Sequence, residues 1–161
     1  EYGHSTNVWG THIAQLDHGS GGGGGCDAPS NYCSTMPNSA GWGATMNYSG
    51  TASYTANDLS LECYGAVPNQ FGIFYYGPNA IQVSFGNGWR CVGGGVYRMN
   101  VMHSGATGSY QKDLDFFTAP PYGATEVDPG ETWRFQCWFR DPPAGGATFN
   151  LTNAVSVDFI P

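Results

Sequence analysis

The sequence is poor in charge. Asp, Glu, Lys and Arg make up 11% of its 161 residues, and Lys112 is its one lysine. This is roughly half the charged fraction of an ordinary soluble protein. A surface built instead from Ser, Thr, Asn, Gly and Tyr is typical of an extracellular protein, or of one in lasting contact with copies of itself. The formal net charge is −7 and the arginines form no basic stripe, so nucleic acid is not an expected partner.

Helical periodicity and long apolar runs are also missing. No segment repeats apolar residues at helical spacing over three turns, and 25 glycines and 10 prolines argue further against helices. No apolar run approaches the roughly 18 residues of a membrane helix. The chain begins at Glu1 and contains no signal sequence, so we expect a mature chain whose targeting segment has been removed.

Motifs that carry catalysis are absent as well. There is no Gly-x-Ser-x-Gly elbow, and no helix pattern follows Gly93–Gly95 to make it a phosphate loop. A metal site needs several converging ligands, and the four histidines are too dispersed for one: His4, His12, His18 and His103. Acidic residues between Asp113 and Glu131 form no distinctive glycosidase pair. We therefore expect no enzyme activity, no cofactor and no metal.

Composition divides the chain into three regions. Residues 1–16 are nearly uncharged and rich in residues that favour extended structure, so they are predicted to form an extended N-terminal arm. Residues 17–25 (DHGSGGGGG) have the composition of a flexible linker. Residues 26–161 are predicted to form one compact β domain.

Within this domain, short apolar runs and alternating segments are separated by turn residues. Trp133, Phe135, Cys137 and Phe139 share one face of a predicted strand, with polar residues and Trp138 on the other. Similar signals recur at 59–63, 71–76, 81–85, 96–102, 110–116 and 155–159, and Gly86-Asn87-Gly88 marks a tight turn. Seven to nine such strands predict an all-β fold, a single β-sandwich of jelly-roll or immunoglobulin-like type.

The domain resembles a region of secreted proteins from planctomycete- and myxobacteria-type organisms, over about four fifths of the chain. The resemblance rests on motifs that include Asn31-Tyr32-Cys33, Pro68-Asn69-Gln70-Phe71-Gly72, Val83-Ser84-Phe85-Gly86-Asn87-Gly88, Arg90-Cys91-Val92-Gly93-Gly94, Trp133-Arg134-Phe135-Gln136 and Phe149-Asn150-Leu151-Thr152. It implies an exported domain and no particular chemistry. The arm and the glycine linker are not part of it.

Five cysteines without a Cys-x-x-Cys spacing favour disulfides in an oxidising compartment over a metal site. Cys63 and Cys91 both belong to the pattern resembled and are predicted to pair. The region resembled often ends in Phe-Cys-Pro, whereas this chain ends in Phe-Ile-Pro. Cys33 would thereby lose a partner, and Cys26 is its nearest substitute. Cys137 is then expected to be a buried free thiol.

Two functions remain. The first is a structural subunit of an extracellular filament or surface assembly, in which the arm adds a strand to the sheet of a neighbouring copy, giving a head-to-tail homopolymer. Its expected inserting residues are Val8, Trp9, Ile13 and Leu16. The alternative is a carbohydrate-binding or adhesive module that stacks glycans on exposed tryptophans, with Trp42, Trp89 and Trp138 as candidates. Both place the protein outside the cell or at its surface.

Overall fold

The computed structural model describes residues 28–117 and 127–161, and the predicted arm, the linker and Cys26 lie outside these ranges. The described residues form ten strands and two short 3-10 turns, η1 (Gly105–Thr107) and η2 (Pro142–Ala144). The strands are β1 (Ser30–Tyr32), β2 (Thr45–Ser49), β3 (Ser60–Tyr64), β4 (Phe71–Gly77), β5 (Asn79–Phe85), β6 (Gly88–Gly93), β7 (Tyr97–His103), β8 (Tyr110–Asp113), β9 (Thr132–Arg140) and β10 (Phe149–Asp158). The predicted all-β class is confirmed.

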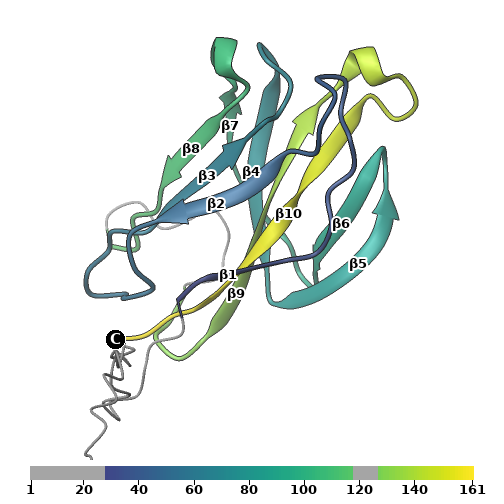
Figure 1. Ribbon diagram of the computed structural model, residues 1–161. Helices are drawn as coiled ribbons and strands as arrows, with labels where there is room; N and C mark the ends of the chain where they lie inside the picture. The colour runs from purple at the N-terminus through teal and green to yellow at the C-terminus, as the bar shows by residue number, and fades with distance from the viewer. Residues whose placement is uncertain (1–27, 118–126) are drawn as a thin grey trace, which may run out of the picture.

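Three antiparallel sheets are stacked in layers (Figure 1). The largest has the order β1-β10-β9-β4-β7, and its inner face packs on the three-stranded sheet β2-β3-β8. The β5–β6 hairpin lies against the outer face of the five-stranded sheet. The fold is therefore a β-sandwich with an additional hairpin layer on one side.

Alternation along the central strands determines which side chains enter which layer. On β9, Trp133, Phe135, Cys137 and Phe139 belong to the inner core, as their period-2 spacing predicts. The residues between them face the hairpin, where Trp138 packs against a second, smaller cluster around Tyr75 and Leu151. Because both faces of β9 are covered, this strand is buried along most of its length.

The tight turn predicted at 86–88 is present, and its loop has two residues. Phe85 pairs with Gly88 across Gly86 and Asn87. Gly86 adopts a φ of 63°, and a Cβ added there would lie 2.1 Å from the Phe149 ring. Glycine is therefore required on two grounds, backbone conformation and the close approach of β10.

The predicted disulfide pairing is wrong. Cys33, which follows β1, is bonded to Cys91 on β6, while Cys63 and Cys137 are buried free thiols. Cys63 cannot reach Cys91, because Cys63 lies in the inner core and Cys91 lies in the hairpin cluster on the opposite face of the five-stranded sheet. Cys33 is likewise unavailable to Cys26. The expectation of a buried free thiol at Cys137 is confirmed.

Candidate functional site

A groove opens between the β5–β6 hairpin and the outer face of the five-stranded sheet, beside β7. Its volume is about 530 Å³. Sheet residues form its floor, among them Ile73, Tyr75, Trp138 and Leu151. The hairpin contributes Phe85 and Arg90 to its walls, and the β7 side contributes Val96, Arg98 and Val101. We refer to this feature as the β7 groove.

The groove contains a continuous row of aromatic rings. The Phe85 ring centroid lies 5.2 Å from that of Phe149, which in turn lies 5.4 Å from that of Trp138. Phe85 is 44% exposed, so the outer end of the row is open to solvent. These rings come from β5, β10 and β9, three strands that no sequence-local pattern would group together.

The polar groups of the groove are few and cationic. Arg90 and Arg98 line it, and no carboxylate does so among the described residues. The Arg90 side chain is held by a hydrogen bond of 2.9 Å from its Nε to the Val92 carbonyl oxygen. Tyr75 lies in the floor. Burial raises the pKa of its hydroxyl, and the positive charge of Arg90 lowers it by a smaller amount. The groove therefore suits an apolar occupant without positive charge.

The hydroxyl of Tyr75 is not available to an occupant. It donates a hydrogen bond to the Gln136 side-chain oxygen, which also accepts from the Cys91 backbone N–H at 2.9 Å. The Gln136 amide donates to the carbonyl oxygens of Trp89 at 2.8 Å and Thr152 at 2.6 Å. Gln136 is fully buried, so this network fixes the hairpin on the sheet and shapes the groove.

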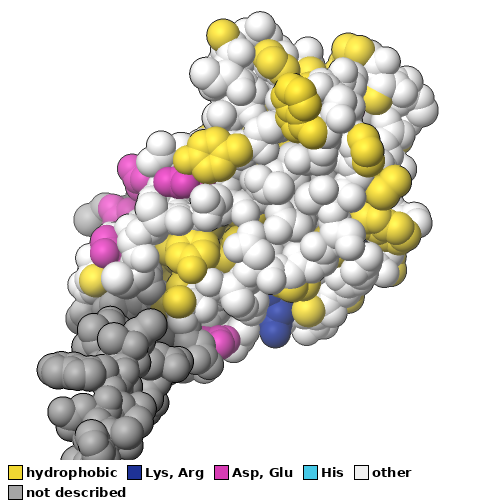
Figure 2. Space-filling view, viewed as in Figure 1, with side chains coloured by type: hydrophobic (Ala, Val, Ile, Leu, Met, Phe, Trp, Pro, Cys, Tyr) yellow, Lys and Arg dark blue, Asp and Glu magenta, His cyan; other side chains and the backbone are white. Residues whose placement is uncertain are grey.

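In the described part of the chain, the groove is bordered by an unpaired strand edge, that of β7. β7 pairs with β4, and within residues 28–117 and 127–161 no strand pairs with its other edge. Val101 on this strand is 67% exposed, and Phe71, opposite the end of β7, is 56% exposed. Figure 2 shows that charged side chains are sparse on the visible face, while hydrophobic ones recur along the side where β5 and β6 lie. An unpaired edge beside apolar surface is a site where another strand can add.

The three tryptophans expected to form a ligand platform do not share one surface. Trp138 lines the β7 groove. Trp89 is half-buried in the hairpin cluster, and its carbonyl is bound by Gln136. Trp42 is 59% exposed in the loop between β1 and β2. The expected inserting residues Val8, Trp9, Ile13 and Leu16 lie outside the described residues.

Sequence reasoning missed Phe85, Phe149 and the two arginines as site residues. The alternating pattern of 81–85 showed that one face of β5 is apolar, but not that this face partly lines an open groove. Residues 128–131 form a turn in which the Glu131 N–H donates to the Asp128 carbonyl oxygen at 3.2 Å. Glu131 also accepts a hydrogen bond from the Trp133 indole at 2.8 Å, so it has a structural role there.

No group of three or more His, Cys, Asp or Glu side chains in the described ranges could hold a metal ion. No helix in that part of the chain is long and apolar enough to cross a membrane. No family model matches the chain, and no curated protein or solved structure matches it either.

Proposed function

We propose that the protein is a structural subunit of an extracellular assembly, and that it polymerises when the arm of one copy adds a strand to the β7 edge of the next. The observation that carries the proposal is the open edge of β7 beside an apolar groove. Backbone groups of β7 would supply hydrogen bonds to the added strand, and the groove would accept its side chains. These are the two elements of strand addition at a sheet edge.

The arm has the composition that this acceptor requires. In an extended chain, Trp9 and Ile13 project from the same face about 13 Å apart. Val8 and Leu16 project from the opposite face of such a chain. Glu1 is the one formally charged side chain of residues 1–16, so the arm adds no positive charge to the two arginines of the groove.

The topology is compatible with donation to a neighbour. The segment before β1 enters at one edge of the five-stranded sheet, and β7 forms the opposite edge. Four strand spacings separate the two edges, roughly 19 Å across the sheet. A subunit that donates from one edge and accepts at the other has a head-to-tail interface. Such an interface grows a fibre when the rotation between subunits does not close into a ring.

Export is the remaining part of the proposal. The Cys33–Cys91 disulfide is typical of a protein that folds in an oxidising compartment. Low charge and the resemblance to exported bacterial regions point the same way. A subunit whose surface is largely covered by its neighbours needs fewer lysines and glutamates for solubility than a free monomer does.

A peptide of residues 1–16 tests the acceptor site directly. The peptide carries a fluorophore and is titrated into the chain without residues 1–25, with anisotropy as the readout. We expect saturable binding that Val101→Lys weakens at least tenfold, because a charged side chain would enter the apolar groove. Val83→Lys is the matched control, since Val83 is 49% exposed on β5 and does not line the groove. No binding, or equal loss in both variants, would refute the proposed acceptor.

Glycan binding is the alternative, and the aromatic row of the groove is the feature in its favour. Sugar sites combine such rings with hydrogen-bonding groups that fix the hydroxyls. Here the charged groups are two arginines, and the Tyr75 hydroxyl is already bound to Gln136. A glycan that binds the chain lacking residues 1–25, and loses affinity with Trp138→Ala, would support the alternative.

A further inference from the structure

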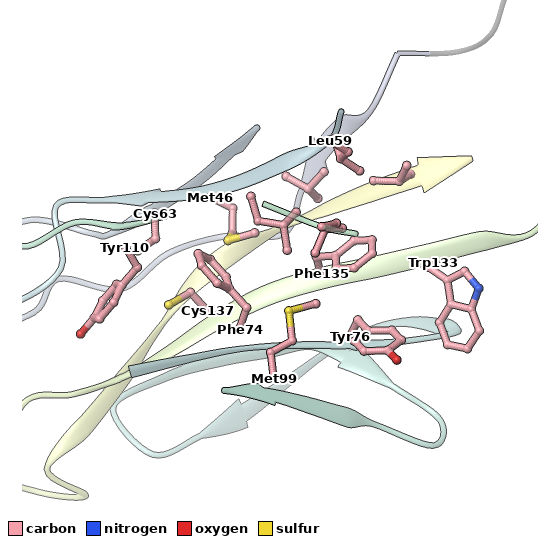
Figure 3. Close-up of a cluster of buried hydrophobic side chains, with 14 of the residues drawn as sticks. Met46, Leu59, Cys63, Phe74, Tyr76, Met99, Tyr110, Trp133, Phe135 and Cys137 are labelled. Atoms are coloured by element: carbon pink, nitrogen blue, oxygen red, sulfur yellow. The ribbon is translucent and has the colours of Figure 1, made fainter. Parts of the chain in front are cut away.

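Two of the free cysteines face each other across the inner core. Cys63 lies on β3 in the three-stranded sheet, and Cys137 lies on β9 in the five-stranded sheet. Both side chains are 0% exposed and belong to the same hydrophobic cluster. Figure 3 shows them on opposite walls of that cluster, with Tyr110 and Phe74 beside them.

Their thiols also interact. Burial raises the pKa of the Cys137 thiol well above its ordinary value, and a hydrogen bond with the Cys63 thiol raises it further. The Cys137 sulfur also lies 3.7 Å from the Trp138 carbonyl oxygen, a weak hydrogen bond. Both sulfurs lie in the apolar core cluster between the two sheets.

In the structure Cys63 and Cys137 are both free thiols. We propose that in secreted protein they are oxidised to a second disulfide, which joins the two sheets through the centre of the sandwich. The geometry that supports it is the placement of two fully buried side chains in one cluster, on strands of facing sheets (Figure 3). The Cys33–Cys91 disulfide already links β6 to the residue that follows β1, on the outer side of the five-stranded sheet. The second bond would connect the layers that the first does not, because β3 and β9 belong to different sheets.

The reaction is a thiol–disulfide exchange with a disulfide oxidant, such as a low-molecular-weight disulfide of an oxidising compartment. One cysteine thiolate attacks the oxidant and forms a mixed disulfide, and one oxidant thiol leaves. The second cysteine thiolate then attacks the protein sulfur of that mixed disulfide and releases the second oxidant thiol. Two cysteines are oxidised, the oxidant takes up two electrons, and the two protons end on its thiols.

Burial determines when this exchange can happen. In the folded protein both sulfurs are inaccessible to an oxidant, and the buried thiol resists conversion to thiolate. The bond must therefore form before the core closes, while the strands are assembling. Once formed, it would be equally protected from reductants. With five cysteines in the chain and four of them paired, Cys26 would be the one cysteine left over.

The test is disulfide mapping of full-length protein secreted into an oxidising compartment. The protein is denatured without reductant in the presence of iodoacetamide, digested, and analysed by mass spectrometry. We expect the Cys63 and Cys137 peptides to be recovered linked and unalkylated, with one alkylatable thiol per chain. Recovery of both peptides in alkylated form, with three thiols per chain, would overturn the proposal.

A Cys26→Ser variant serves as the background for the next measurements, because it prevents disulfide exchange with the fifth cysteine. In this background we expect no alkylatable thiol, and two would contradict the inference. Cys63→Ala together with Cys137→Ala should lower the melting temperature by about 10 °C relative to the background. Because the double substitution also changes packing, both proteins are also measured after unfolding, reduction and refolding under reductant, where the difference between them reports packing alone. If a linked pair is present, reduction must require denaturant.

Discussion

The backbone N–H of Cys91 donates a hydrogen bond of 2.9 Å to the side-chain oxygen of Gln136. This contact places a disulfide cysteine of the hairpin directly over the central strand of the large sheet. The side-chain NH2 group of Gln136 donates hydrogen bonds to the carbonyl oxygens of Trp89 and Thr152. Both polar atoms of the buried side chain are therefore hydrogen-bonded within the protein. Gln136 therefore helps to hold the hairpin, and with it the wall of the β7 groove, on the five-stranded sheet.

Gln136→Leu is expected to lower the free energy of unfolding by about 2–4 kcal/mol. The substitution leaves the Cys91 N–H and the Trp89 carbonyl buried without their partner, and each such group costs about 1–3 kcal/mol. Urea unfolding followed by tryptophan fluorescence measures the change. The control is Gln82→Leu at an exposed position of β5, where we expect a change within about 0.5 kcal/mol. Equal effects of the two substitutions would contradict the role of Gln136.

The Cys33–Cys91 disulfide is expected to contribute about 4 kcal/mol to stability. It joins residues 58 apart in sequence, and closure of a loop of that size restricts the unfolded chain. Replacement of both cysteines by alanine tests this by urea unfolding. The hairpin should also become more accessible to protease, because β6 loses its covalent attachment. A variant as stable as the parent would show that the hydrogen bonds of Gln136 hold the hairpin without help.

Alkaline pH is expected to destabilise the fold through buried tyrosines. Burial raises the pKa of Tyr32 to about 12 from 10.0, and its hydroxyl donates to the Cys91 carbonyl oxygen at 2.8 Å. Burial likewise raises the pKa of Tyr76 to about 12. Since the folded-state pKa is above the unfolded one, this stabilisation is fully present below pH 10. It is lost as the pH rises toward 12.

Urea unfolding at a series of pH values measures this loss. We expect stability to fall steadily above pH 10, and tyrosinate absorbance to rise together with unfolding. Tyr32→Phe should lower stability by about 1 kcal/mol at neutral pH, since it removes one hydrogen bond. The same variant should reduce the slope above pH 10. A slope unchanged by Tyr32→Phe would assign the alkaline transition to other groups.

Most of the strands could be predicted from the sequence, because their two faces meet different surroundings. β9 shows this best, with Phe135 and Phe139 in the inner core and Gln136 between them on the other side. The sequence did not predict β2, because its alternation of apolar and polar residues is weak. Met46 is its one fully buried residue, and its outer face is exposed to solvent. β6 begins and ends at glycine and depends on β5 for its pairing.

The candidate site was less accessible to sequence reasoning. The groove arises where β5, β7 and β10 come together, so no single segment encodes it. The cysteine pairing failed for a related reason. Alternation within a strand shows which residues share a face, but it does not show on which side of a neighbouring sheet that face will lie. Cys63 and Cys91 each read as strand residues, yet the five-stranded sheet separates them.

The groove itself can be probed within the full-length chain. Phe85→Ser would remove the exposed end of the aromatic row while leaving the inner core untouched. We expect this substitution to slow or abolish polymer growth, with a stability change of less than about 1 kcal/mol because Phe85 is partly exposed. Trp42→Ser is the matched control, since Trp42 is also exposed and does not line the groove. Polymer growth unaffected by Phe85→Ser would place the interface elsewhere.

The central claim is that residues 1–16 join one copy of this chain to the next. The most direct measurement compares the full-length chain with a deletion of residues 1–25 by light scattering and negative-stain microscopy. We predict that the full-length chain forms fibres and that the deletion remains monomeric with its domain folded. If both remain monomeric and equally stable, the arm has no role in assembly and the account of a polymerising subunit is wrong.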